Sequence, residues 1–410
     1  MTSIRLVASA PGIPAPTPGG MTSHPGVVLS YGMGADSTAL LLRWMLDPAS
    51  RPCDLRDLLA VTAQTGDEWP VTGELVTRHM LPLLRRHHIR WVQVARAGPR
   101  QADGITVLAD TRAPTTVHLA GDYRLSQELL AAGTVPQTGG ARRCSLKAKG
   151  WPLDEFIATA TGGQPYLHAI GFSVGELARA ARDARYNTPA RTGWYPLIGW
   201  GWDRAAAERY IHHTLGVTWP KSCCTYCPFA LANRAGRTRV IDAFRDDPHA
   251  GITGLIMEHL AVSLNPRQGL MAGERLADLL AAAGLDHTLA LFHRELTQVE
   301  WRVYEVRRAL LPGGRGRAVR WLRAHAAGTR TQMAAELARI AATDGLCISA
   351  DDGIERAWVR RRGAHVPTAE WFYTAAPAGA TDKEGPGFAA AWPAALAGPA
   401  QGELFTPAVA

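Results

Sequence analysis

The sequence of 410 residues has no long apolar run. No apolar stretch approaches the roughly 20 residues needed to span a bilayer, and Ala39–Met45, a typical candidate, already contains Arg43. The stretch Met1–Gly26 is rich in proline and glycine and lacks the continuous apolar core of a signal peptide. We therefore expect a cytoplasmic protein without a membrane span.

Cysteine is also scarce. Six cysteines in 410 residues are too few for a disulfide scaffold. Their placement is uneven, because Cys223, Cys224 and Cys227 lie close together while Cys53 and Cys347 stand apart. In a cytosolic protein, such grouping favours a metal or redox site over structural disulfides.

The positive charge is concentrated in one part of the chain. The formal net charge is +8, and the stretch between Trp301 and Gly363 contains 13 arginines, no lysine and 6 acidic residues, a net charge of +7. Trp321 and Trp358 are interleaved with these arginines. Arginine beside aromatic side chains suits phosphate contact and base stacking in nucleic-acid binding. A solvated, basic helix face is the alternative interpretation.

The first half of the chain alternates short apolar segments with helical patterns. The segments typical of buried strands are Gly26–Ser30, Leu58–Ala63, Ile89–Val94 and Tyr166–Gly171. Helical patterns cover Ser37–Leu46 and Glu74–His87. This alternation predicts an α/β fold, with a doubly wound, mostly parallel sheet between two layers of helices.

The second half is predicted to be helical. Its candidate helices are Leu255–Leu264, Glu274–Ala283, Leu289–Arg307 and Arg317–Ile340. We therefore expect a disordered segment over 1–25, an α/β domain over 26–235, a helical basic region over 236–374 and a disordered tail over 375–410. The tail is rich in alanine, glycine and proline, which cannot bury enough apolar surface to order a chain.

A glycine-rich turn follows the first predicted strand. In VVLSYGMGADSTALLL, Gly32 and Gly34 precede Asp36, Ser37 and Thr38 at the start of a helix. Glycine permits close backbone approach, and the free N–H groups at a helix start bind anions together with the helix dipole. The pattern favours a phosphate site, with an ordinary strand–turn–helix connection capped by Asp36 or Ser37 as the alternative.

Two common phosphate-binding patterns are absent from this turn. No lysine precedes Ser37, which excludes the Walker pattern, and Ser37 stands where the dinucleotide pattern needs a third glycine. The segment SYGMGADST instead resembles the PP-loop of the ATP pyrophosphatase (adenine nucleotide α-hydrolase-like) superfamily. It is most similar to the phosphoadenosine phosphosulfate (PAPS) reductase-like branch. The residues that carry this match are Ser30, Gly32, Gly34, Asp36, Ser37 and Thr38.

Later segments resemble the same branch in the same order, over residues 26–230. TGDEWP, after the second predicted strand, contains Gly66 and Glu68, although Gln64 replaces the aspartate that leads this segment in the family. GFSVGELAR contains Glu176 and Arg179. The match in VPQTGGARRCSLKAKGWPLDEF rests on Cys144, on Arg142 or Arg143, and on Lys147 or Lys149. The closing segment runs from YPLIGWGWDR to GVTWPKSCCTYCPF and contains Lys221 and three cysteines.

The resemblance implies a set of ligands and roles. It implies that ATP and Mg²⁺ are bound by Ser30, Gly32, Gly34, Asp36, Ser37, Thr38, Gly66, Glu68, Glu176 and Arg179. It implies that the catalytic residues are Asp36, Ser37, Lys147 and Lys221. It further implies a [4Fe–4S] cluster on Cys144, Cys223, Cys224 and Cys227. A zinc site or inert buried thiols are the alternatives to the cluster.

Three functions fit these features. The first is an enzyme that adenylates an acceptor with release of pyrophosphate and then transfers sulfur from a donor protein to RNA, DNA or a small molecule. The second is a PAPS or APS reductase, which needs a nucleophilic cysteine near its C-terminus. The last cysteine here is Cys347, and the ending QGELFTPAVA has none, so we prefer the first function. The third is a non-catalytic component that binds nucleotides and nucleic acid.

Overall fold

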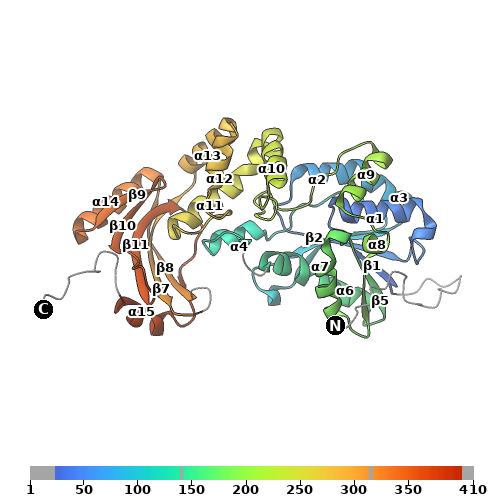
Figure 1. The fold of residues 1–410 in the computed structure, drawn as a ribbon, viewed down its shortest axis with the longest axis horizontal. Coiled ribbons are helices and arrows are strands. Elements are labelled where there is room, and N and C mark those ends of the chain that lie inside the picture. The colour runs from blue at the N-terminus through green and yellow to red at the C-terminus, as the bar shows by residue number, and fades with distance from the viewer. Residues whose placement is uncertain (1–23, 139–141, 314–316, 399–410) are drawn as a thin grey trace. The chain divides into compact units, whose positions relative to one another are not determined.

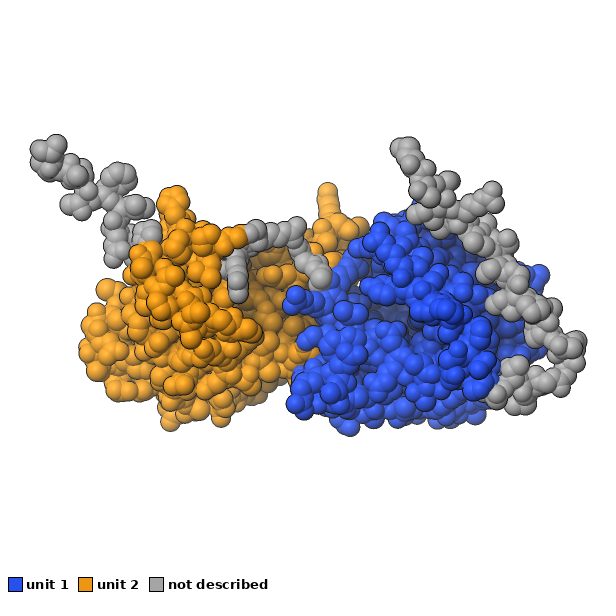
Figure 2. Space-filling view, turned by 90° about the horizontal axis from the view of Figure 1, so that it is seen from below, with its two compact units in different colours: residues 1–125, 141–225 blue, residues 126–140, 226–410 orange. Residues whose placement is uncertain are grey.

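The computed structural model describes residues 24–138, 142–313 and 317–398. The chain divides into two compact units, which Figure 2 colours separately. Unit 1 comprises residues 1–125 and 141–225, and unit 2 comprises residues 126–140 and 226–410. Nearly all of the segment 1–25, which we expected to be disordered, lies outside the described residues. Within the described ranges, no helix is both long and apolar enough to cross a membrane.

Unit 1 is built on a six-stranded sheet with the order β4-β3-β2-β1-β5-β6 (Figure 1). The strands are β1 (Val27–Ser30), β2 (Leu58–Gln64), β3 (Arg90–Arg96), β4 (Ile105–Thr111), β5 (Tyr166–Ile170) and β6 (Arg191–Trp194). All neighbouring pairs are parallel except β3 and β4. The predicted α/β class with a mostly parallel sheet is confirmed.

Helices cover both faces of this sheet. Side chains of β2 alternate between the two faces, because successive strand residues point in opposite directions. Leu58 and Ala60 pack with α1 (Ala35–Leu46), α3 (Leu81–Arg86) and α9 (Arg204–Leu215). Leu59 and Val61 pack with α6 (Trp151–Thr161) on the other face. Burial on both faces explains why these strands have almost continuous apolar sequences.

The remaining helices of unit 1 are short. They are α2 (Pro70–Leu75), which a π-helical turn (Val76–Met80) joins to α3, followed by α5 (Arg143–Ser145), α7 (Leu177–Asp183) and α8 (Pro196–Gly199). A second π-helical turn, Leu146–Gly150, leads into α6.

The strand order reverses at β1. From β1 the chain continues to β2 on one side, whereas β5 is added on the other side. The connections that leave the carboxyl ends of β1 and β5 therefore run in opposite directions. In open parallel sheets, the carboxyl ends of the strands at such a reversal are the usual place for a ligand.

Unit 2 contains a second six-stranded sheet, with the order β12-β8-β7-β11-β10-β9 and only antiparallel pairs. Its strands are β7 (Trp301–Leu311), β8 (Arg317–Gly328), β9 (Cys347–Asp351), β10 (Ile354–Arg360), β11 (Thr368–Pro377) and β12 (Lys383–Glu384). Its helices are α4 (Leu125–Ala131, whose first residue belongs to unit 1), α10 (Arg234–Asp246), α11 (Ile252–Leu264), α12 (Leu276–Ala282), α13 (Asp286–Gln298), α14 (Arg330–Asp344) and α15 (Phe388–Leu396).

The prediction that residues 236–374 form a helical region is wrong after residue 298. The predicted helix Leu289–Arg307 ends at Gln298, and β7 begins at Trp301. The predicted helix Arg317–Ile340 is strand β8, followed by helix α14 from Arg330. The cause is packing on both faces of the sheet: one face of β7 lies against α11 and the other against α15.

The prediction that residues 375–410 form a disordered tail is also wrong for residues 375–398. Strand β11 continues to Pro377, and α15 buries Phe388, Ala391 and Ala395 against the sheet. Alanine alone contributes little burial, but here it lets a helix approach a sheet face closely, while Phe388, Trp392 and Leu396 supply large apolar side chains. Residues 399–410 lie outside the described residues.

Candidate functional site

The loop from Tyr31 to Gly34 joins β1 to α1 at the point where the strand order reverses. Gly34 is the N-cap of α1, and no side chain caps this helix start, so no capping side chain occupies the first-turn N–H groups. A Cβ on Gly34 would lie 3.2 Å from Ser222 Cβ, whereas a Cβ on Gly32 would meet nothing within 4 Å. The indole Nε1 of Trp219 donates to the carbonyl oxygen of Met33 at 2.8 Å and fixes the loop.

Asp36 lies in the first turn of α1 and is only 8% exposed. Its Oδ2 forms an ion pair with Arg204, and its buried Oδ1 has no hydrogen-bond partner among the described residues. Burial raises the pKa of Asp36 to about 6, an effect that Arg204 opposes and the carboxylates of Glu176 and Glu208 reinforce. A cation at Oδ1 would favour the ionised carboxylate.

Ser37 and Thr38 are both buried, and their hydroxyls have different partners. The Ser37 hydroxyl donates to the Gly34 carbonyl oxygen at 3.3 Å, a long bond at the edge of the loop. Thr38 is fully buried, and its hydroxyl donates to the Tyr31 hydroxyl at 3.4 Å. The structure therefore places the Ser37 hydroxyl at the loop and holds the Thr38 hydroxyl in the core.

Ser30, at the end of β1, forms a hydrogen bond with His168 of β5. The Ser30 hydroxyl lies 2.8 Å from His168 Nε2, and Arg191 Nε donates to His168 Nδ1 at 2.9 Å. Because Nδ1 accepts, we assign the proton of the neutral ring to Nε2, which donates to Ser30. Arg191 is held in turn by a two-bond ion pair with Asp183. Burial, followed by the charge of Arg191, lowers the pKa of His168 to about 4.

Glu176 and Arg179 follow β5 and lie close enough to affect Asp36 electrostatically. They form an ion pair with each other, and the Arg179 guanidinium stacks 4.6 Å from the centre of the Phe172 ring. At Gly171, immediately after β5, a Cβ would lie 3.0 Å from Ser37 N. The structure therefore brings the predicted segment after β5 to the start of α1.

Gly66 and Glu68 shape the loop after β2. Gly66 has φ +88°, and a Cβ there would lie 2.8 Å from Arg124 Cβ, so the position requires glycine. The Glu68 carboxylate is 8% exposed and accepts hydrogen bonds from Ser222 Oγ at 2.7 Å and from Cys223 N at 2.9 Å. Burial raises the pKa of Glu68, while Lys149 and these hydrogen bonds oppose the shift. Glu68 thus anchors the cysteine segment, and its predicted role in nucleotide binding stays a prediction.

The predicted catalytic lysines occupy different surroundings. Lys147 lies in the π-helical turn before α6, with its ammonium 5.7 Å from the centre of the Trp151 ring. Lys221 is exposed and directly precedes Ser222. The lysine whose charge acts on Glu68 and Cys224 is Lys149, the alternative that the sequence left open beside Lys147.

Three of the four predicted ligand cysteines belong to unit 1: Cys144, Cys223 and Cys224. Cys227 follows Cys224 by three residues but belongs to unit 2. Cys224 forms an isolated bridge with Glu68, and its thiol lies 3.4 Å from Thr65 Oγ1. Burial raises the pKa of Cys224 to about 12. Among the described residues, no three or more histidine, cysteine, aspartate and glutamate side chains form a group that could hold a metal ion. The [4Fe–4S] cluster on these four cysteines stays a prediction from the sequence.

Sequence reasoning missed three residues of this site: His168, Arg204 and Ser222. A functional role for His168 could not be predicted, because it lies in the apolar strand segment YLHAIG, where the neighbouring residues indicate only burial. Arg204 has a local signal, because it follows the N-cap Asp203 at the start of α9. Nothing in the sequence pairs it with Asp36, which lies 168 positions earlier.

Comparisons of the chain with protein-family models, with curated proteins and with solved structures give no match. The function proposed below therefore rests on the geometry of this site and on the resemblance of its motifs.

Proposed function

We propose that this chain is a PP-loop enzyme, with an adenine nucleotide α-hydrolase-like fold, that binds ATP and adenylates an acceptor with release of pyrophosphate. The observation that supports it best is the position of the uncapped α1 start. It follows β1 at the point where the strand order reverses, beside the segment that follows β5. A nucleotide bound there has its phosphates at a helix N-terminus, which favours negative charge.

The residues around the loop suit a triphosphate. Backbone N–H groups of the first turn of α1 point toward the loop and donate to phosphate oxygens. The Ser37 hydroxyl exchanges its long bond to Gly34 for a phosphate oxygen. The guanidinium groups of Arg179 and Arg204 add positive charge close to Asp36. Together these donors neutralise the charge of the phosphates.

The reaction is a displacement at the α-phosphorus of ATP. An acceptor oxygen forms a bond to this phosphorus while the bond to the oxygen that bridges to the β-phosphorus breaks. The bonding electrons leave with pyrophosphate, and the proton of the acceptor passes to solvent or to a neighbouring base. The N–H groups of α1 and the two arginines stabilise the negative charge that develops on pyrophosphate.

The buried Oδ1 of Asp36 fits a magnesium ion. It is a carboxylate oxygen without a hydrogen-bond partner among the described residues, and carboxylate oxygens are preferred ligands of Mg²⁺. When bound, Mg²⁺ supplies positive charge to the phosphates. Asp36 then serves to position the ion at the loop.

Sulfur transfer is the second part of the proposal. A sulfide ion supplied by a donor protein forms a bond to the adenylated atom of the acceptor, which is RNA, DNA or a small molecule. The bond from that atom to the AMP oxygen breaks, and AMP leaves with the bonding electrons. This part is supported by the resemblance to the PAPS reductase-like branch alone. The [4Fe–4S] cluster stays a prediction from the sequence, and no step here passes through it.

Calorimetric titration of ATP with Mg²⁺ tests the nucleotide site. We expect Asp36→Asn to weaken Mg²⁺-dependent ATP binding about tenfold or more, because a neutral amide loses a charge-assisted contact. Asp47→Asn, at the other end of α1, is the matched control and should bind as the wild type does. In a mixture containing acceptor, Ser37→Ala should slow pyrophosphate release. An Asp36→Asn variant that binds ATP like the wild type would refute the assignment.

A further inference from the structure

Unit 2 contains an open cavity of about 490 Å³. We call it the basic cavity, because three cationic side chains line it: Arg308, Arg320 and Lys383. We propose that the basic cavity binds a phosphate group. This site lies in a different unit from the ATP site, and the proposal does not depend on that site.

The sheet itself brings the three cations together. Arg308 of β7 and Arg320 of β8 are directly opposite in the antiparallel register. Lys383 of β12 is opposite Leu322, which is two residues from Arg320 and therefore points to the same face of the sheet. Like charges placed directly opposite each other destabilise a sheet, so this arrangement has an energetic cost that an anion would offset.

The protein balances only part of this charge. Arg308 donates to Glu370 Oε2 at 2.7 Å and to Asn265 Oδ1 at 2.7 Å. Arg320 donates to the carbonyl oxygens of Ala132 and Gly133, which are dipoles and not charges. The Lys383 ammonium has no hydrogen bond or ion pair with the described residues. Three cations thus face one carboxylate, which leaves an excess positive charge that matches a phosphate dianion.

The pKa shifts of two of these cations agree with an excess of positive charge in the basic cavity. Burial, followed by repulsion from Arg308, lowers the pKa of Arg320 to about 10. Burial and the charge of Arg320 lower the pKa of Lys383 as well. Both groups would be stabilised in their charged form by a bound anion.

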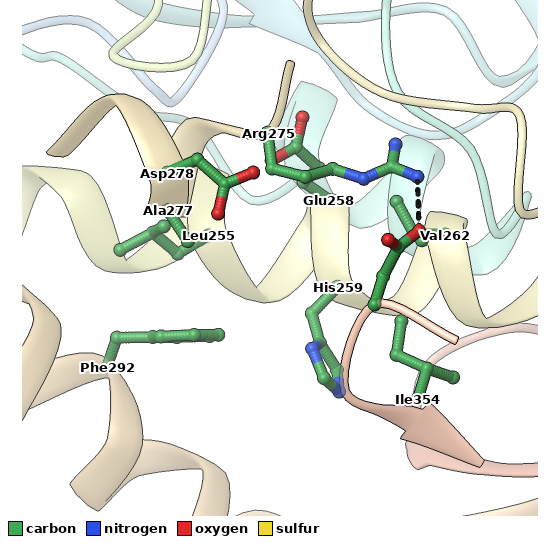
Figure 3. Close-up of a pocket in the computed structure, with 10 residues that line it drawn as sticks. Leu255, Glu258, His259, Val262, Arg275, Ala277, Asp278, Phe292 and Ile354 are labelled. Atoms are coloured by element: carbon green, nitrogen blue, oxygen red, sulfur yellow. Dashed lines mark hydrogen bonds and ion pairs between the residues drawn. The ribbon is translucent and has the colours of Figure 1, made fainter. Parts of the chain in front are cut away.

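A second cavity of unit 2, of about 210 Å³, has the opposite charge balance (Figure 3). Its lining contains Arg275 together with the carboxylates of Glu258, Asp278 and Asp352. Arg275 Nη2 lies 3.4 Å from Asp352 Oδ2, and burial lowers the pKa of His259 to about 4. Carboxylates therefore outnumber cationic side chains in this lining, whereas the cations of the basic cavity are in excess.

The rest of the basic cavity suits phosphate more than a nucleobase. Its described lining contributes hydroxyl and amide groups from Thr134, Asn265 and Gln268, which can bond phosphate oxygens. The same lining provides no aromatic side chain for stacking on a base. The phosphate can belong to a free anion or to the backbone of a nucleic acid, and the chemistry of recognition is the same for both.

Calorimetric titration of the full chain tests this site, with inorganic phosphate in one arm and a short single-stranded oligonucleotide bearing a 5′-hydroxyl in the other. Lys383→Met is the informative variant, because Lys383 is exposed and supports no other residue through a hydrogen bond in the described structure. We expect this variant to weaken binding about tenfold or more. If Lys383→Met binds inorganic phosphate more weakly than the wild type does, the ligand is a free anion. If it binds the oligonucleotide more weakly, the ligand is a nucleic-acid phosphate.

Arg294→Met is the matched control. It removes one positive charge from an exposed position on α13, outside the lining of the basic cavity, and should leave both isotherms unchanged. Phosphate binding at the loop of unit 1 is common to all three proteins, so the difference between them reports the basic cavity alone. Coinciding isotherms for the wild type and Lys383→Met in both arms would overturn the proposal.

Discussion

His168 of β5 links this strand to β1, its neighbour in the sheet. Its ring lies between the Ser30 hydroxyl of β1 and the Arg191 guanidinium, which is held by Asp183. Both ring nitrogens are engaged, and the acceptor nitrogen faces a cation. Protonation of His168 would place two positive charges side by side and break the bond from Arg191.

This geometry predicts that the protein loses stability between pH 6.5 and 4. The pKa of His168 is about 4 in the folded chain, whereas an unperturbed histidine has a pKa of 6.5, so the unfolded chain binds the proton first. The contribution of His168 to stability is complete above about pH 6.5 and is reduced by about 3 kcal/mol as the pH drops to 4. Urea unfolding across this range should show a weaker pH dependence in His168→Gln than in the wild type.

His213→Gln is the control, because His213 is exposed on α9. It should retain the wild-type pH dependence. A residual dependence in His168→Gln is also expected, since burial lowers the pKa of His259 to about 4 in unit 2. If His168→Gln and the wild type showed the same slope, the assignment of the proton linkage to His168 would be wrong.

At the residue scale, the sequence predicted the positions of the site better than its contacts. The loop residues Gly34, Asp36 and Ser37 do lie together at the start of α1, because they are neighbours in the chain. The partner of Asp36 could not be predicted, because Arg204 comes from a helix 168 positions later and is brought near by packing of α9 on α1. Long-range pairs depend on the fold and leave no local pattern.

At the scale of elements, Glu68 connects the loop after β2 to the segment Ser222–Cys224. Its carboxylate accepts from the backbone of Trp69 and Cys223 and from the hydroxyl of Ser222. Thr225 N also donates to Asp67 O at 3.0 Å, which adds a second tie between these loops. Glu68 is thus the one buried acid among several contacts that hold the cysteine segment against the loop after β2.

Glu68→Gln should therefore release the cysteine segment. An amide presents one acceptor oxygen where the carboxylate presents two, so at least one buried donor loses its partner, at a cost of about 1–3 kcal/mol. We expect lower stability in urea and faster reaction of Cys224 with a thiol reagent. Glu74→Gln, an exposed change on α2, is the control. Unchanged thiol reactivity in Glu68→Gln would show that other contacts hold the segment.

The sequence predicted the central elements of unit 1 because each has a strong local signal. β1, β2, β3 and β5 are buried on both faces and have apolar runs. β4, an antiparallel edge strand with only partial burial, was missed. In unit 2, the sequence of β8 favours a helix, because alanine and arginine favour helices in isolation, whereas cross-strand pairing with β7 and β12 decides the outcome.

At the scale of the whole molecule, two separate stretches of the chain make up unit 2. Residues 126–140 leave unit 1 and belong to unit 2, although they are surrounded in the sequence by segments of unit 1. Within unit 2, Ala131 O accepts from Thr381 N at 3.0 Å, and Arg320 bonds to the carbonyl oxygens of Ala132 and Gly133. A Cβ on Gly133 would lie 2.5 Å from the Leu264 side chain, so the segment packs tightly against α11.

Because residues 126–140 belong to unit 2, we can predict the effect of cutting the chain between residues 225 and 226. Fragment 226–410 alone lacks the segment that satisfies Arg320 and Thr381, so we expect it to be less stable than unit 2 in the intact chain. Co-expressed with fragment 1–225, which carries residues 126–140, it should recover this stability and co-purify with that fragment. Replacing residues 126–140 by a glycine–serine linker of equal length provides the control. A fragment 226–410 that melts alone at the temperature reached with its partner would show that the inserted segment contributes nothing to the stability of unit 2.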